Sequence, residues 1–165
     1  MKDPFKTASK NRYSHIKLSK EGLANAQGPK DRKGDFFPFI RDVSHFGEHK
    51  DGIKSSDYAE IKVGHNIYFR ADIFGVPVDE NFNANTVYDF IIKDPAGKIA
   101  QEYNNVPCVE GFVKRRFVLL PPKKMVQWHI PKDAMPGEYS ATMIVHDKIT
   151  GQKTQTTTKF TVNGS

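Results

Sequence analysis

The sequence has one cysteine, Cys108, among its 165 residues, and a single cysteine cannot form an intrachain disulfide. It contains no run of roughly eighteen apolar residues, the length that a transmembrane helix needs. It also lacks a Gly-rich phosphate loop, a Gly-x-Ser-x-Gly nucleophile motif and a diagnostic pair of carboxylates. From these absences we expect that the chain is not an enzyme, has no catalytic residue and needs no cofactor.

Charge is distributed unevenly along the chain. Residues 1–34 hold nine lysines and arginines against three acidic residues, and this balance equals the formal net charge of +6 of the whole chain. The few apolar residues of this segment follow neither a helical nor a strand period. The sequence therefore predicts a basic, largely unstructured arm at 1–34 and one globular domain at 35–165, which is long enough to bury a core.

The arm allows three interpretations. It is an ordinary solvated extension, an arm that attaches to the acidic surface of a protein partner, or a segment that binds nucleic acid or anionic lipid. Its basic residues are spread out and have few aromatic neighbours, which argues against nucleic acid. In the arm we expect partner contacts at Lys6, Lys10, Arg12, Tyr13, Lys17 and Lys20.

After the arm, short segments of alternating apolar and polar residues are separated by Gly, Pro, Asn and Asp, the pattern of antiparallel strands. No segment has a convincing helical period. Strands are expected at residues 36–43, 58–75, 86–93, 98–103, 112–120, 125–130, 138–147 and 153–162. The pattern predicts an all-β fold, an antiparallel sandwich of about seven to nine strands.

Alternation within these segments selects the side chains that face the core. The expected core includes Phe69, Ile73, Phe90, Ile92, Phe117, Trp128, Tyr139, Met143 and Phe160. In the segment 112–120, Val113, Phe117 and Leu119 are expected to face inward. Lys114 and Arg116 are then expected to point outward together, where they either keep an edge strand from pairing with another chain or contact a partner.

Four motifs follow one another in an order that resembles a known family. They are Gly64-His65-Asn66-Ile67-Tyr68-Phe69, Asp94-Pro95-Ala96-Gly97-Lys98, Pro131-Lys132-Asp133-Ala134-Met135-Pro136-Gly137-Glu138-Tyr139 and the turn at 147–151. Over residues 36–163 the chain resembles the immunoglobulin-like modules of bacterial envelope and secreted proteins. The resemblance implies an immunoglobulin-like antiparallel β-sandwich in which Tyr139 begins the penultimate strand. Ala141 stands where antibody-type domains carry their second core cysteine, so an antibody-like disulfide core is excluded. The resemblance favours the cell envelope, and a cytoplasmic location stays open.

Two loops carry residue types found in metal sites. His45 and His49 have the spacing of a zinc-binding pair on a helix, but the glycine and polar residues around them favour a loop without a further ligand. Residues 79–85 resemble the start of a calcium loop, although Ala84 stands at the glycine position and Phe90 at the position of the closing glutamate. We expect no metal at the histidines, and calcium at 79–85 stays open.

Two functions follow from these observations. The first, which we favour, is a non-enzymatic structural or assembly protein. Its sandwich docks in a larger protein complex, its basic arm attaches to an acidic partner surface, and Lys114 and Arg116 are further partner contacts. The second is a ligand-binding module, for carbohydrate or another surface ligand, with exposed Tyr68, Phe74 or Tyr103 as a stacking platform.

Overall fold

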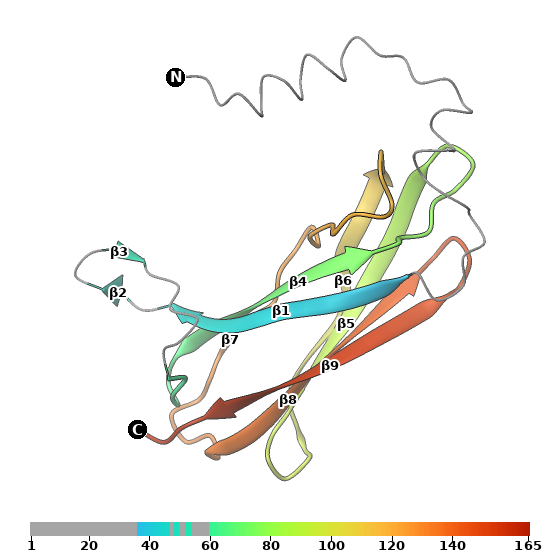
Figure 1. Cartoon of the computed structure of the whole chain (residues 1–165). Helices are drawn as coiled ribbons and strands as arrows, with labels where there is room; N and C mark the ends of the chain where they lie inside the picture. The colour runs from blue at the N-terminus through green and yellow to red at the C-terminus, as the bar shows by residue number, and fades with distance from the viewer. Residues whose placement is uncertain (1–35, 47, 50–51, 54–59) are drawn as a thin grey trace, which may run out of the picture.

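Figure 1 shows the computed structural model of the chain, in which the strands form two layers. The structure describes residues 36–46, 48–49, 52–53 and 60–165. The arm at 1–34 lies outside these residues, so its boundary and its partner contacts stay predictions. The described residues form strands and no helix, so none of them belongs to a helix long and apolar enough to cross a membrane.

Two antiparallel sheets make up the sandwich (Figure 1). The first has three strands in the order β1-β4-β7, and the second has four in the order β6-β5-β8-β9. The pair β2 and β3 forms a separate small hairpin. The strands are β1 (Phe37–Phe46), β2 (Glu48–His49), β3 (Gly52–Ile53), β4 (Asn66–Phe74), β5 (Asn83–Lys93), β6 (Ile99–Phe112), β7 (Gln127–His129), β8 (Gly137–Asp147) and β9 (Lys153–Val162). The fold is all-β and sandwich-like, in agreement with the prediction.

The hairpin of β8 and β9 shows how local sequence produces this sheet. Along β8, buried residues alternate with half-buried ones, as the period of two requires;. After the strand, the Asp147 carboxylate accepts backbone N–H bonds from Ile149 (3.0 Å) and Thr150 (2.9 Å). The chain then reverses through Gly151 at φ 77°, a left-handed conformation that costs glycine little. The predicted turn between the last two strands is confirmed.

Aromatic rings fill the space between the two sheets. Phe69 of β4 packs against Phe90 of β5 with ring centroids 4.7 Å apart, and Tyr139 of β8 stacks on Phe160 of β9 at 5.7 Å. The Tyr139 hydroxyl donates a hydrogen bond of 2.7 Å to the carbonyl of Met135, which ties β8 to the chain just before it. Eight of the nine predicted core residues are buried, and the exception, Phe117, is half-buried.

Several predicted strand boundaries are wrong. β6 continues to Phe112, so the predicted connection at 104–111 is strand despite Pro107. Proline is tolerated because β6 is an edge strand, where a missing N–H need not interrupt a ladder;. The predicted strand at 112–120 is an irregular segment in which Leu120 forms an isolated bridge with Ile73. β1 also extends to Phe46, beyond the end of the strand predicted at 36–43.

Candidate interaction surface

Six apolar side chains gather on the outer face of the three-stranded sheet. Phe37 of β1 pairs in register with Phe74 of β4, and their ring centroids lie 5.3 Å apart. The Phe74 ring lies 5.7 Å from that of Phe117. Because Leu120 bridges Ile73, the preceding Leu119 lies beside Phe74 on the outer face;. We name this surface the apolar strip; its members are Phe37, Phe39, Phe74, Phe117, Val118 and Leu119.

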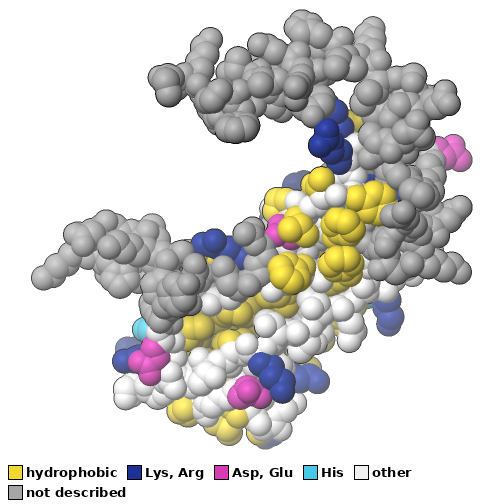
Figure 2. Space-filling view, viewed as in Figure 1, with side chains coloured by type: hydrophobic (Ala, Val, Ile, Leu, Met, Phe, Trp, Pro, Cys, Tyr) yellow, Lys and Arg dark blue, Asp and Glu magenta, His cyan; other side chains and the backbone are white. Residues whose placement is uncertain are grey.

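The apolar strip is open to solvent. Leu119 is 51% exposed, Phe39 49%, Phe37 41% and Val118 37%. Figure 2 shows hydrophobic side chains gathered in the upper part of the view, over the start of β1 and the end of β4. Contiguous exposed surfaces of large apolar side chains commonly mark interaction sites. We therefore take the strip as the candidate functional site.

The segment that connects β6 to β7, residues 113–126, adds positive charge beside the strip. This basic loop carries five lysines and arginines and no acidic residue. Arg115, Lys123 and Lys124 are exposed, and Lys114 is half-buried. Three members of the strip belong to the same loop, so the apolar surface and the positive charge are neighbours along the chain. This arrangement suits a partner whose apolar contact is bordered by acidic groups.

Arg116 does not point outward, as the sequence had predicted. It is 3% exposed, and its Nε donates a hydrogen bond of 2.7 Å to the carbonyl of Val76. Its own carbonyl accepts the N–H of Gly75 at 2.9 Å, and its guanidinium lies 5.1 Å from the centre of the Phe117 ring. Because no regular strand forms at 112–120, the expected alternation fails. Arg116 instead holds the basic loop against the connection between β4 and β5.

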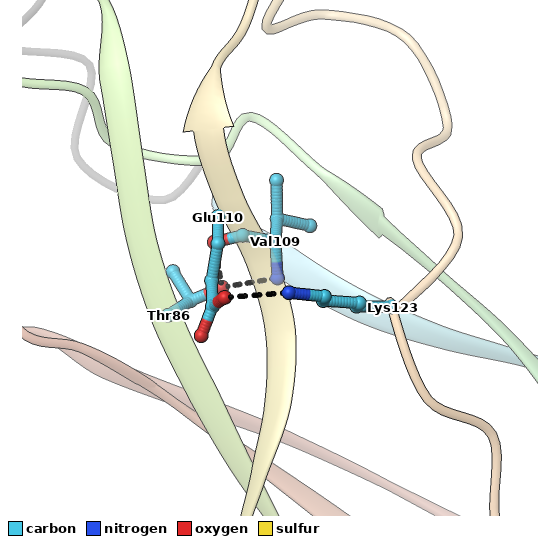
Figure 3. Close-up of polar contacts among 4 residues, drawn as sticks. All are labelled: Thr86, Val109, Glu110 and Lys123. Carbon is cyan, nitrogen blue, oxygen red and sulfur yellow. Dashed lines mark hydrogen bonds and ion pairs between the residues drawn. The ribbon is translucent and has the colours of Figure 1, made fainter.

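The other end of the basic loop is fixed along β6. Lys123 donates its backbone N–H to the carbonyl of Cys108 at 2.7 Å. Its ammonium lies 3.3 Å from the Glu110 carboxylate in an exposed ion pair (Figure 3). The Tyr88 hydroxyl donates a hydrogen bond of 2.6 Å to the carbonyl of Lys124. Since the loop is held near both ends, its exposed side chains stand on a fixed backbone.

Thr86 compensates for an irregularity in the sheet next to this attachment. The register between β5 and β6 shifts between Asn85 and Val87, and Thr86 is fully buried there. Its hydroxyl accepts the N–H of Val109 at 2.8 Å and donates to the carbonyl of the same residue at 3.0 Å (Figure 3). The side chain thus satisfies two buried backbone groups where the ladder is interrupted.

Burial keeps two ionisable groups near this attachment neutral. It raises the pKa of the Cys108 thiol to about 11. Burial is also the main reason why the pKa of the Tyr88 hydroxyl is raised well above its usual value, and the neighbouring Cys108 adds to that effect;. Since the thiolate is the reactive form of cysteine, Cys108 is a packing residue near neutral pH.

The two loops with metal-site residue types have different outcomes. The side chains of His45 and His49 lie outside the described residues. Asp79 Oδ1 accepts the backbone N–H groups of Asn81 (2.8 Å) and Asn83 (3.0 Å), so this carboxylate stabilises a turn. Across the part of the chain that the structure describes, no three His, Cys, Asp or Glu side chains are grouped as metal ligands would be.

Tyr68, Phe74 and Tyr103 do not form one stacking platform. The Tyr68 hydroxyl accepts a hydrogen bond of 3.0 Å from Arg70, whose guanidinium also lies 5.5 Å from the centre of the same ring. Tyr103 belongs to the other sheet and donates its hydroxyl proton to the carbonyl of Gln127 at 2.8 Å. Of the three, Phe74 alone contributes to the apolar strip.

The sequence prediction missed the main members of the strip. Phe37 and Phe39 alternate with Pro38, and this alternation could have placed both rings on one face of β1. The prediction that Leu119 faces inward is wrong, since the side chain is 51% exposed. No regular strand forms in the basic loop, so alternation could not indicate the exposure of Val118 and Leu119. The predicted contact residues come together only in part: Lys114 borders the strip, and Arg116 is buried.

Comparisons with known proteins assign no family to this chain. No family model matches it, and no curated protein matches its sequence. Among solved structures it is similar to a family 123 glycoside hydrolase from Clostridium perfringens, analysed for the details of glycolipid glycan hydrolysis. That match has a TM-score of 0.41 and 14% sequence identity, and it covers 79% of this chain and 27% of that chain.

This match contradicts the prediction that the chain is not an enzyme, since the matched chain is a glycoside hydrolase. The prediction is therefore withdrawn. No activity, substrate or catalytic residue is carried over, because the similarity is below the level at which a fold or equivalent side chains can be inferred. The described residues are those of an all-β, sandwich-like domain, which spans about a quarter of that hydrolase chain.

Proposed function

We propose that this chain is a structural or assembly protein whose sandwich docks into a larger protein complex through the apolar strip. The basic loop and the basic arm then face acidic groups of the partner. The observation that carries this proposal is the strip itself, with four exposed large apolar side chains, two from β1 and two from the basic loop, which has no acidic residue. Protein contacts of this kind combine an apolar centre with a charged rim.

The apolar part of the contact supplies binding free energy. Removing exposed phenylalanine and leucine side chains from water is favourable by roughly 25 cal/mol for each Å² of apolar surface. The Phe74 ring already packs against the rings of Phe37 and Phe117, so these side chains have little freedom left to lose on binding;. A partner with a flat apolar surface fits this face better than a small polar ligand does.

The charged part of the contact selects the partner. Lys114, Arg115, Lys123 and Lys124 all lie in the basic loop, and Lys123 pairs with Glu110 of β6. Exposed charges of one sign raise the rate of association with a surface of opposite sign. Salt weakens this attraction, because it screens exposed charges over about 8 Å at physiological ionic strength.

The position of the arm in the chain supports the same partner. Its last residue, at position 34, is three residues before Phe37, which is the first member of the strip. A partner that covers the strip is therefore within reach of the arm and its excess of six positive charges. The contacts proposed for the arm remain Lys6, Lys10, Arg12, Tyr13, Lys17 and Lys20.

We also infer that the sandwich is of the immunoglobulin-like type found in bacterial envelope and secreted proteins. Three features support this inference: one sheet of three strands and one of four, a tyrosine at the start of the penultimate strand, and its hydroxyl bond to the upstream backbone;. Such folds host many functions, so the inference concerns architecture and not activity.

Affinity purification from the native host tests the proposed function. The full chain is compared with the double variant Phe39→Ser and Leu119→Ser, and with the chain that lacks residues 1–34. The matched control is Ile149→Ser, which removes an exposed apolar side chain from the turn between β8 and β9 (39% exposed). Recovered proteins are quantified by mass spectrometry, and folding of each variant is checked by thermal denaturation.

We expect one set of proteins to be recovered with the full chain and with Ile149→Ser, and to be depleted with the double variant. Deletion of residues 1–34 should reduce recovery and its dependence on salt while leaving the melting temperature nearly unchanged. Equal recovery with the double variant and with the control would show that the strip is not the docking surface.

A further inference from the structure

A polar hollow lies on the three-stranded sheet, at the end away from the apolar strip. Its volume is about 420 Å³, and the described residues that line it are Asn66 of β4 and Gln127, Trp128 and His129 of β7. Asn66 begins β4, whereas Phe74, a member of the strip, ends it. Eight positions of extended strand separate these two residues by roughly 26 Å. The hollow is therefore a separate site.

Three polar side chains of the hollow share one face of the sheet. Ile67 and Trp128 pair in register, and both are buried. The residues that alternate with them, Asn66, Gln127 and His129, therefore lie on the outer face. All three are exposed. Since they come from two paired strands and not from a loop, their backbone positions are fixed by the ladder.

Two contacts orient the polar groups before any ligand binds. His129 Nδ1 lies 2.7 Å from Asn66 Oδ1. Because an amide oxygen only accepts, the imidazole donates from Nδ1, and in the neutral ring Nε2 is then an acceptor. The carbonyl of Gln127 accepts a hydrogen bond of 2.8 Å from the Tyr103 hydroxyl, which ties β7 to the other sheet.

The chemistry of these groups favours a neutral ligand that is rich in hydroxyl groups. None of the described residues that line the hollow carries a formal charge, so an ion would lose hydration there without gaining an opposite charge. A hydroxyl group both donates and accepts, and an amide offers a donor and an acceptor side by side. The half-buried ring of Tyr68, in register with Gln127, adds apolar surface of the kind that stacks on a sugar ring;.

We propose that the hollow binds a neutral carbohydrate, with Asn66, Gln127 and His129 as its hydrogen-bonding residues. The volume lies within the range of about 300–1,000 Å³ that small-molecule sites have. Each hydrogen bond to the ligand replaces one to water, so its net gain is small, and we expect a Kd on the order of 1 mM. The apolar strip takes no part in this binding, and the inference does not rest on the proposed function.

Nuclear magnetic resonance of the isotope-labelled full chain provides the first test. The probes are soluble neutral oligosaccharides of glucose, xylose, mannose and N-acetylglucosamine, each added to about 10 mM, roughly ten times the expected Kd. At least one of them should shift the side-chain amide signals of Asn66 and Gln127 and approach saturation. An anionic galacturonate oligosaccharide is the control probe, and it should shift these signals less.

Substitutions provide the second test. Asn66→Ala and Gln127→Ala should each weaken binding of the same oligosaccharide by about two- to tenfold, the effect of losing one hydrogen bond. The matched control is Gln155→Ala, which removes an exposed amide from β9 of the other sheet and should leave the Kd unchanged. Because each amide removed is exposed, the melting temperatures of the variants should stay close to that of the original chain;.

The proposal is overturned if no neutral oligosaccharide shifts the amide signals of Asn66 and Gln127. Stronger binding of the galacturonate probe at these residues would also overturn it, as would equal affinity of the double variant Asn66→Ala and Gln127→Ala. The variant Phe39→Ser and Leu119→Ser should bind the oligosaccharide as the original chain does. Failure of the strip as a docking surface and failure of the hollow as a carbohydrate site are therefore distinguishable.

Discussion

Substitution of Thr86 by valine measures how much one hydroxyl contributes to this sheet. Valine has nearly the same shape, so the change removes the oxygen and leaves the packing almost intact. The N–H and C=O of Val109 then lose their partners at a place where the ladder with β5 is interrupted. Each buried backbone group left without a partner costs about 1–3 kcal/mol. Since valine needs no desolvation of a hydroxyl, we expect a net loss of about 2–4 kcal/mol.

Urea denaturation followed by circular dichroism gives this loss directly, because a change in midpoint at constant slope is a change in stability. The control is Thr142→Val, in which the hydroxyl removed is exposed and contacts that of Thr157 at 2.9 Å; it should change stability by less than about 0.5 kcal/mol. Hydrogen exchange at the Val109 amide should accelerate in Thr86→Val. A loss below about 0.5 kcal/mol in Thr86→Val would refute the argument that the hydroxyl replaces ladder bonds.

Two further predictions concern the core. Trp128→Ala should destabilise the domain by about 3–5 kcal/mol in the same urea assay. The reason is that the indole is 7% exposed and its ring lies 5.9 Å from that of Tyr139. A loss below about 1 kcal/mol would contradict the place of Trp128 in the core. Cys108 should react with iodoacetamide at pH 8 far more slowly in the folded chain than in urea, since burial raises its pKa to about 11. Its unfolded thiol ionises near pH 9, so its contribution to stability is complete below pH 9 and is lost as pH rises toward 11;. Cys108→Ala should remove the loss of stability that ionisation of this thiol causes between pH 9 and pH 11. Equal alkylation rates in the folded and the unfolded chain would contradict the raised pKa.

Features that depend on neighbouring residues could be predicted from the sequence. The alternation of β8 and the turn at 147–151 are set by side chains within a few positions of one another, and both are observed. The turn at Asp94 is another example: its carboxylate accepts the N–H of Ala96 at 2.9 Å, and Gly97 adopts φ 82°. Local hydrogen bonds and glycine conformations leave a recognisable pattern in the sequence.

Features that depend on distant residues could not. Arg116 is buried because its donors find the carbonyls of Val76 and Gly75, about forty positions earlier in the chain. Nothing near Arg116 in the sequence indicates those acceptors, and a basic residue in an alternating segment normally faces water. The apolar strip was missed for a related reason. Alternation shows that Phe37 and Phe39 share a face, but whether another sheet covers that face is decided by the whole fold.

The directions of β1 and β9 have a mechanical consequence. In Figure 1 both strands run from the right of the view to the left, so the start of β1 and the end of β9 lie at opposite ends of the sandwich. A force that pulls Phe37 and Val162 apart acts along both strands. It loads the nine pairs between β1 and β4, and the ten pairs between β9 and β8, all at once rather than one after another. A protein under tension between these two points would therefore extend little before either ladder ruptures as a unit.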